Sequence, residues 1–215
     1  MNAERILNTV VIAGLVLFPL WAWMADEAFL ITLATKAVIF ALAGVGLNLA
    51  LGIGGLVSLG HAAFFGLGGY AMGILASHAQ SYAPIMTAPF VLEGTKNMPV
   101  IWLVAIVTSG LAALAIGALS LRTSGVYFIM ITLAFGQMLY YFAISWPAYG
   151  GEDGLSIYVR NSFPGLNTLD PIQYYMICAV ILFAVLLFSA RLARAPFGLA
   201  LGAARQSPLR VQTVV

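Results

Sequence analysis

The charge-free runs of this chain constrain its fold more than any other feature. Five stretches contain no Asp, Glu, Lys or Arg: residues 6–25, 37–92, 97–121, 123–151 and 171–190. A helix needs about 20 mostly apolar residues to cross a bilayer, and the second run is long enough for two such helices. The pattern therefore predicts six spans, near residues 6–24, 29–51, 59–77, 100–119, 126–144 and 172–189.

The composition leads to the same class of protein. Only 7% of the 215 residues are charged and 62% are hydrophobic, whereas an average soluble domain is about 25% charged. We therefore expect an all-α integral membrane protein with one transmembrane domain over residues 1–215. The first run exceeds the 7–15-residue apolar core of a secretory signal, so we interpret it as a retained first span. Cys178 is the single cysteine, which excludes a disulfide within the chain.

The basic residues predict the orientation, because cytoplasmic segments of membrane proteins carry an excess of Lys and Arg. With the N-terminus inside and six alternating spans, the inside segments hold six basic residues and the outside segments hold three. The inside residues are Arg5, Arg122, Arg191, Arg194, Arg205 and Arg210, and the outside residues are Lys36, Lys96 and Arg160. Both termini are therefore expected in the cytoplasm.

A glycine cluster separates the second and third predicted spans. Gly52, Gly54 and Gly55 lie in a connection, residues 52–58, that contains no charge. Glycine accepts backbone conformations that break a helix. Lipid cannot hydrogen-bond a free backbone, so irregular chain at membrane depth must be buried in protein or line a wet cavity. We expect a broken or re-entrant connection here. Beyond it, Gly66, Gly69 and Gly73 would let another helix approach closely.

Polar residues beside this break are candidates for a substrate pathway, because polar groups within spans usually face a bundle interior or a cavity. They are Asn48, Ser58 and His61, together with Tyr127. The sequence favours structural roles for three of them. Ser58 would be the N-cap of a helix that begins at Leu59, His61 would bond a backbone carbonyl, and Asn48 would bond a neighbouring helix.

Four segments, in this order, resemble inner-membrane permease subunits of branched-chain amino acid ABC importers of the LivM and LivH type. They are NLALGIGGLVSLGHAAFFGLGGY (residues 48–70), LRTSGVYFIMITLAFGQMLYYF (121–142), GGEDGLS (150–156) and APFGLALGAARQSP (195–208). The resemblance implies a transport subunit of the bacterial inner membrane rather than an enzyme. It also implies that the family fold continues past Val215, so that this chain is a C-terminally truncated version.

The resemblance also implies partners. These are a second permease subunit, cytoplasmic ATPase subunits and a periplasmic substrate-binding protein. Glu152 and Asp153 would contact the binding protein, and Arg205 and Arg210 would lie at or beside the ATPase contact. Pro196 would open a short helix on the cytoplasmic side, and Ser207 and Pro208 would begin another over residues 208–215.

No catalytic group, metal or cofactor is expected in this chain. It has no G-x-x-x-x-G-K-[ST] phosphate loop, so ATP would be used by a separate subunit. Its two histidines and single cysteine lack the spacing of a metal site. Two alternatives remain for the function: a permease for urea or short amides, and a passive channel with a Gly-rich re-entrant segment.

Overall fold

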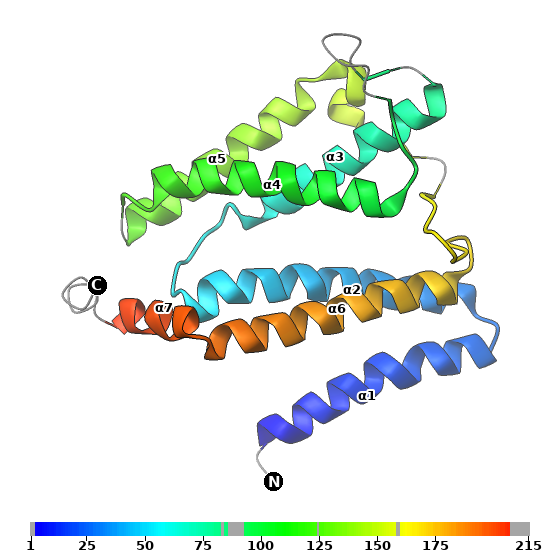
Figure 1. Ribbon diagram of the computed structural model, residues 1–215, viewed down its shortest axis with the longest axis horizontal. Helices are drawn as coiled ribbons and strands as arrows, with labels where there is room; N and C mark the ends of the chain where they lie inside the picture. Colours follow the sequence, from blue (N-terminus) through cyan, green and yellow to red (C-terminus); the bar gives the residue numbers. More distant parts are fainter. Residues whose placement is uncertain (1–2, 83, 86–92, 124, 158–159, 207–215) are drawn as a thin grey trace. The chain divides into compact units, whose positions relative to one another are not determined.

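The computed structural model describes residues 3–82, 84–85, 93–123, 125–157 and 160–206. Seven α-helices follow one another in this part of the chain, and short turns of other helix types occur between α2 and α3 and between α5 and α6 (Figure 1). The helices are α1 (Ala3–Met24), α2 (Ala28–Asn48), α3 (His61–Ser81), α4 (Met98–Ser120), α5 (Val126–Ile144), α6 (Pro171–Arg194) and α7 (Pro196–Gln206). The turns are the π-helical η1 (Leu49–Ile53) and the 3-10 turns η2 (Pro147–Tyr149) and η3 (Gly151–Asp153).

The helices confirm the expected all-α membrane class. Each predicted span overlaps one α-helix, and α5 has the predicted bounds. Five helical segments in the described part of the chain are long and apolar enough to cross a bilayer. They are Ala28–Ile53, His61–Ser81, Met98–Ser120, Val126–Ile144 and Pro171–Arg194. The apolar part of α1, Thr9–Met24, is shorter.

Two compact units make up the structure, and the chain passes from one to the other at residues 49–50 and again at 166–167. The first unit comprises residues 1–49 and 167–215, and its described part contains α1, α2, α6 and α7. The second comprises residues 50–166 and contains α3, α4 and α5. The expectation of a single functional domain over residues 1–215 stays a prediction.

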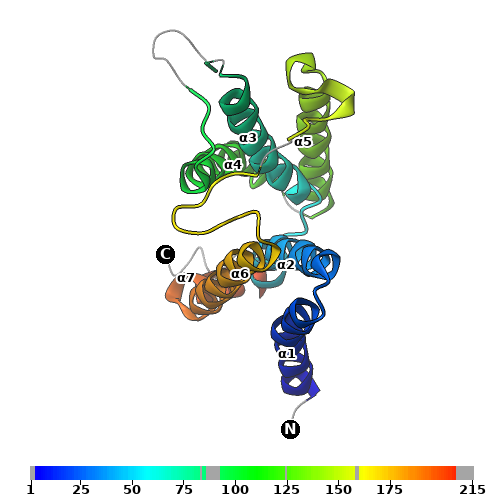
Figure 2. The same cartoon turned by 90° about the vertical axis from the view of Figure 1, so that its right-hand side faces the viewer.

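In the first unit, α2 packs along α6 and α1 packs against α2 (Figures 1 and 2). Buried side chains from the three helices meet in one core: Ala22, Ile31, Val38, Tyr175 and Leu182. The hydroxyl of Tyr175 donates a hydrogen bond to the backbone carbonyl of Leu15, which ties α6 to α1.

A tight corner joins α6 to α7. Ala195 adopts an extended conformation, with φ −70° and ψ 159°, so the α-helix stops there. Pro196 then opens α7, as predicted. The backbone of Gly198 lies directly against the carbonyl oxygens of Leu192 and Ala193, so that a Cβ at this position would overlap both.

In the second unit, α3 packs against α4 and α5. The hydroxyl of Ser109 on α4 donates to the carbonyl of Phe64 on α3 at 3.2 Å. A Cβ on Gly68 would lie 3.3 Å from that hydroxyl oxygen, whereas one on Gly66 or Gly69 would meet nothing within 4 Å. Gly68 therefore faces α4, and the close approach of another helix at Gly66 and Gly69 stays a prediction.

The predicted break between the second and third spans is present. Gly54 and Gly55 lie outside the helices, and Gly55 has φ +67°. The amide of Leu56 donates to the carbonyl of Ala50 at 3.1 Å, which folds the chain back after the π-helical turn. Gly52 belongs to that π-helical turn rather than to the open connection.

The start of α3 differs from the prediction. The helix begins at His61 instead of Leu59, and its N-cap is Gly60, which makes no side-chain cap hydrogen bond. The predicted cap at Ser58 is therefore wrong. The physical reason lies on α5, because the backbone of Gly60 presses against the carbonyl of Thr132 so closely that a Cβ would overlap it. This packing fixes where the chain turns into α3.

Candidate functional site

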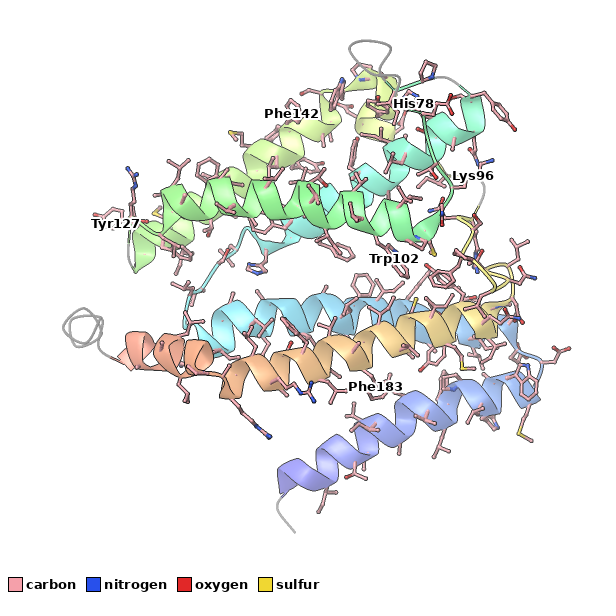
Figure 3. The ribbon with its side chains drawn as sticks, in the orientation of Figure 1. His78, Lys96, Trp102, Tyr127, Phe142 and Phe183 are labelled. Carbon is pink, nitrogen blue, oxygen red and sulfur yellow. The ribbon has the colours of Figure 1, made fainter. Side chains whose placement is uncertain are left out.

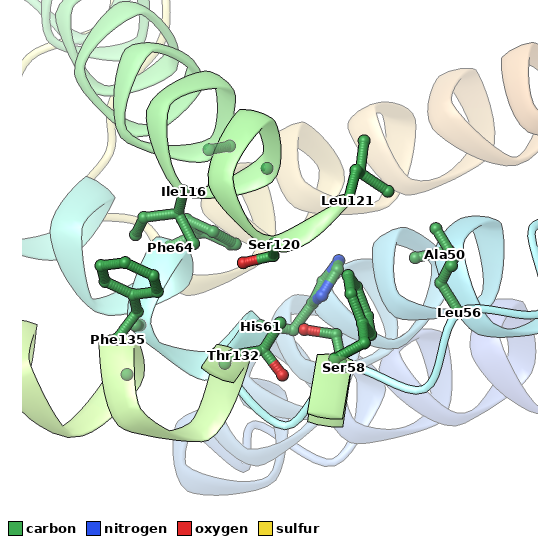
Figure 4. Close-up of a pocket in the computed structure, with 16 residues that line it drawn as sticks. Ala50, Leu56, Ser58, His61, Phe64, Ile116, Ser120, Leu121, Thr132 and Phe135 are labelled. Atoms are coloured by element: carbon green, nitrogen blue, oxygen red, sulfur yellow. The ribbon is translucent and has the colours of Figure 1, made fainter. Parts of the chain in front are cut away.

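A pocket of about 240 Å³ lies within the second unit, where α3 and α5 begin and α4 ends (Figure 4). Three helices and the preceding connection contribute its walls. The connection and α3 supply Ala50, Leu56, Ser58, Gly60, His61, Ala63 and Phe64. The other helices supply Ala113, Ile116, Gly117, Ser120 and Leu121 from α4, with Phe128, Thr132, Phe135 and Gly136 from α5.

Small residues create the pocket. Gly60 lets the start of α3 touch the backbone of α5, and a Cβ on Gly136 would lie 3.4 Å from the Cα of Gly60. This contact brings the two helices together at one level. On α4, Ala113 and Gly117 occupy the facing wall with little side-chain volume. The pocket is the space left between this close contact and the small residues opposite.

Four polar side chains line the pocket: Ser58, His61, Ser120 and Thr132 (Figure 4). The Thr132 hydroxyl donates to the carbonyl of Ile129 at 2.9 Å. The His61 ring stands edge-on to the ring of Phe64, with centroids 5.9 Å apart and an interplanar angle of 85°.

Two of these side chains have buried polar atoms that make no hydrogen bond within the described part of the chain. They are Nδ1 of His61 and Oγ of Ser120. Ser120 is only 1% exposed. The bond from His61 to a backbone carbonyl that the sequence suggested is therefore not made by Nδ1.

The structure brings together two of the four residues that the sequence suggested for a pathway. Ser58 and His61 line the pocket, whereas Tyr127 does not. Tyr127 is 74% exposed at the start of α5 (Figure 3). Its neighbour Phe128 is buried and lines the pocket instead. Asn48 is exposed at the end of α2 in the first unit.

Sequence reasoning missed Ser120 and Thr132. Ser120 is the final residue of α4, directly before Leu121 and Arg122, and it looks like an ordinary polar residue at a span end. Thr132 sits within the apolar α5, where a hydroxyl is a usable signal because it needs a partner at membrane depth.

The acidic pair on the 150–156 segment is exposed. Glu152 and Asp153 form the 3-10 turn η3, directly after η2. Tyr149 anchors η2 to α3, since its hydroxyl lies 3.1 Å from Nε2 of His78 and its carbonyl accepts from the Tyr70 hydroxyl at 3.3 Å. Both carboxylates therefore follow directly after a turn that Tyr149 holds against α3.

Of the two arginines predicted at the ATPase contact, only Arg205 lies within the described residues. Arg205 is exposed in the last turn of α7. Arg210, and the helix predicted over residues 208–215, lie outside the described residues.

The pocket wall offers apolar contacts and uncharged hydrogen-bonding groups. None of its described lining residues is an Asp, Glu, Lys or Arg. In the described part of the chain, no three His, Cys, Asp or Glu side chains gather as a metal site would require. This arrangement suits the holding or passage of a small molecule.

Comparisons with known proteins indicate the family of the chain. The model of one protein family, described as the permease component of the branched-chain amino acid transport system, matches residues 29–214. The high-affinity branched-chain amino acid transport system permease protein LivM of Escherichia coli K12 is 27% identical over 157 residues. The protein of the same name from Salmonella typhimurium LT2 is 27% identical over 156 residues.

These alignments cover 73% and 72% of this chain but 33% of each relative. The chain thus spans about a third of the length of the curated relatives it matches. No solved structure matches it. Because the family model covers most of the helices described above, the chain belongs to the family of permease components of branched-chain amino acid transport systems.

Proposed function

We propose that this chain is a permease subunit of an ATP-driven importer for branched-chain amino acids. It forms a substrate path together with a second permease subunit in the bacterial inner membrane, and a separate subunit hydrolyses ATP. The observation that carries the proposal is the family match over residues 29–214. Five helical segments able to cross a bilayer support it.

The proposed topology puts both termini in the cytoplasm. The support is the excess of arginines in the segments that this topology places inside. On this topology, the pocket lies toward the cytoplasmic face, because it sits where α4 ends beside Leu121 and Arg122. Ser58 and His61 then belong to the inner part of the path. Asn48 and Tyr127 stay proposed contributors to the path without a place in this pocket.

Two surfaces are proposed for the partner proteins. Glu152 and Asp153 face the periplasmic binding protein, supported by their exposure on an anchored turn. Arg205 and Arg210 lie at or beside the ATPase contact, supported by the exposure of Arg205 on α7. A short helix with a basic end at the membrane face is a suitable surface for a soluble subunit to push.

Uptake of labelled leucine tests the transport role. The chain is co-expressed with a partner permease, ATPase subunits and a binding protein in cells without their own branched-chain importer. We expect leucine uptake that requires this chain and stops when ATP is depleted. Uptake of urea or acetamide without leucine uptake would identify the amide permease instead. Uptake that continues without ATP and without the ATPase subunits would identify a passive channel.

Cysteine labelling tests the topology. In a Cys178→Ala background, a membrane-impermeant maleimide is expected to label Gln206→Cys only in inside-out vesicles. Asp153→Cys is the matched control, which we expect to be labelled only in intact spheroplasts. Labelling of Gln206→Cys from the periplasmic side would contradict the orientation.

The same cysteine variants test the ATPase contact. Gln206→Cys and Gln212→Cys are expected to crosslink to a co-expressed ATPase subunit, while Asp153→Cys does not. Labelling of Gln206→Cys on the cytoplasmic side without any crosslink would leave the topology standing and remove the coupling role.

A further inference from the structure

The strap, residues 147–155, follows α5 and has a tightly closed backbone. The amide of Asp153 donates to the carbonyl of Gly150 at 3.1 Å. Gly150 has φ +88°, and a Cβ there would overlap the carbonyl oxygen of Gly154. The residues on either side of η3 therefore touch through their backbones, which leaves the strap little freedom to change shape.

Tyr149 attaches the first half of the strap to α3. Its hydroxyl lies 3.1 Å from Nε2 of His78, and the centroids of the two rings are 5.7 Å apart. Its carbonyl accepts from the hydroxyl of Tyr70 at 3.3 Å, and the same hydroxyl lies 3.2 Å from the carbonyl oxygen of Ala143 on α5. Two side chains that lie about two turns apart on α3 therefore hold Tyr149.

Leu155 attaches the second half of the strap to α3. Gly73 is buried on this helix, and a Cβ there would overlap Cδ2 of Leu155 and lie 3.6 Å from Cδ1 of Ile157. The missing side chain of Gly73 therefore makes room for that of Leu155. Because Gly73 lies between Tyr70 and His78 in the sequence, both attachments use the same stretch of α3.

The exposed residues Glu152 and Asp153 lie between the two attachments. Tyr149 is three positions before Glu152, and Leu155 is two positions after Asp153. A partner that binds a flexible segment must order it, and this ordering weakens the association. A strap fixed on both sides of its exposed turn is already ordered before the partner arrives.

We propose that Leu155 and Gly73, together with Tyr149 and His78, are positioning residues for the docking of the periplasmic binding protein. They hold the strap in one conformation, so that the carboxylates between them meet basic side chains of the partner without an ordering cost. The inference rests on the proposed function, which takes the binding-protein contact at the strap as given. It adds the residues on α3 that make this contact effective.

Dependence of transport on the concentration of binding protein tests the positioning role. The assay is uptake of labelled leucine into proteoliposomes that contain this chain, its partner permease and the ATPase subunits. We expect Leu155→Ala to raise the half-saturating concentration of leucine-loaded binding protein about tenfold, because the partner must then order the strap. The maximal rate and the thermal midpoint are expected to stay at the parental level. A lower maximal rate with unchanged half-saturation would overturn the positioning role.

Gly73→Ala tests the same contact from α3, because the added methyl group displaces Leu155. We expect this variant to raise the half-saturating concentration as well. If both substitutions act through one contact, the double variant with Leu155→Ala is no worse than the poorer single variant, whereas independent effects would multiply. Multiplied effects would overturn the pairing of Leu155 with Gly73.

Two further variants separate the attachment from general effects on the helices. Tyr149→Phe loses the hydroxyl beside His78 and keeps the ring and the carbonyl, and we expect a two- to fivefold rise in half-saturation, the effect of one neutral hydrogen bond. Gly110→Ala on α4 is the matched control for Gly73→Ala, since a Cβ there would meet nothing within 4 Å. We expect it to behave like the parent. An equal rise for Gly110→Ala and Gly73→Ala would overturn the specific role of Gly73.

The double variant Glu152→Gln with Asp153→Asn distinguishes failure of this inference from failure of the proposed contact. We expect it to raise the half-saturating concentration in the parental background. If it does so while Leu155→Ala and Gly73→Ala have no effect, the contact stands and the positioning role is overturned. If it has no effect, the proposed contact of the acidic pair is wrong, and the inference that depends on it falls as well.

Discussion

Replacement of Gly60 by leucine is expected to prevent the accumulation of folded protein. A Cβ at Gly60 would overlap the carbonyl oxygen of Thr132 and lie 3.1 Å from its carbonyl carbon. These are backbone atoms of α5, so no side-chain rotation relieves the contact. Overpacking of this kind costs about 3 kcal/mol, or roughly a hundredfold in the ratio of folded to unfolded protein. The measurement is the monodisperse fraction in size-exclusion chromatography after detergent extraction, with the thermal midpoint of any folded remainder.

Gly66→Leu is the matched control for this variant. Gly66 lies on the same helix, and a Cβ there would meet nothing within 4 Å. We expect Gly66→Leu to behave like the parent chain, or to gain slightly because leucine is a better helix former than glycine. Equal loss in both variants would show that glycine itself, rather than the contact with α5, is required along α3. A fully folded Gly60→Leu protein would contradict the close packing.

The second large effect is expected from the double replacement Gly54→Leu and Gly55→Leu. A Cβ on Gly54 would lie 2.7 Å from the carbonyl oxygen of Ala50. Gly55 has φ +67°, a conformation that costs an L-residue roughly 1–2 kcal/mol. The connection would have to refold, and the walls at Leu56 and Ser58 would move with it. We expect loss of leucine uptake and a rise in protease cleavage after residue 50.

Gly44→Leu with Gly46→Leu is the corresponding control. These two glycines lie on α2, and a Cβ on either would meet nothing within 4 Å. We expect the control protein to resist protease as the parent does. Parental uptake and parental protease resistance in the Gly54 and Gly55 double variant would show that the connection tolerates side chains, contrary to its backbone geometry.

The helices were largely predictable because hydropathy and charge determine spans directly. The bounds of α5 could be derived from the apolar run between Gly125 and Ser145. The start of α3 could not be derived from the sequence in this way. It depends on the contact of Gly60 with Thr132, which are 72 positions apart in the sequence. Such a contact leaves no local signal, and Ser58 offered a plausible cap that the fold does not use.

The candidate site was predictable only where polar residues flank the glycine break. Ser58 and His61 stood out for that reason and do line the pocket. Tyr127 was predicted as a polar candidate, yet its neighbour Phe128 lines the pocket and Tyr127 does not. Thr132 and Gln137 are isolated polar residues in the otherwise mostly apolar α5, so no polar stripe along the helix indicates which face turns inward. The choice between adjacent residues therefore requires the packing of α3 and α4.

The close packing at the corner between α6 and α7 couples the movement of these two helices. Gly198 is wedged against the last carbonyls of α6, and the amide of Leu199 donates to the carbonyl of Ala195 at 3.0 Å. A joint packed backbone to backbone has little freedom to bend. A load applied to α7 would therefore turn α6 rather than flex the corner. Because α6 packs along α2, the torque would pass into the helix that leads to the π-helical turn at Leu49–Ile53.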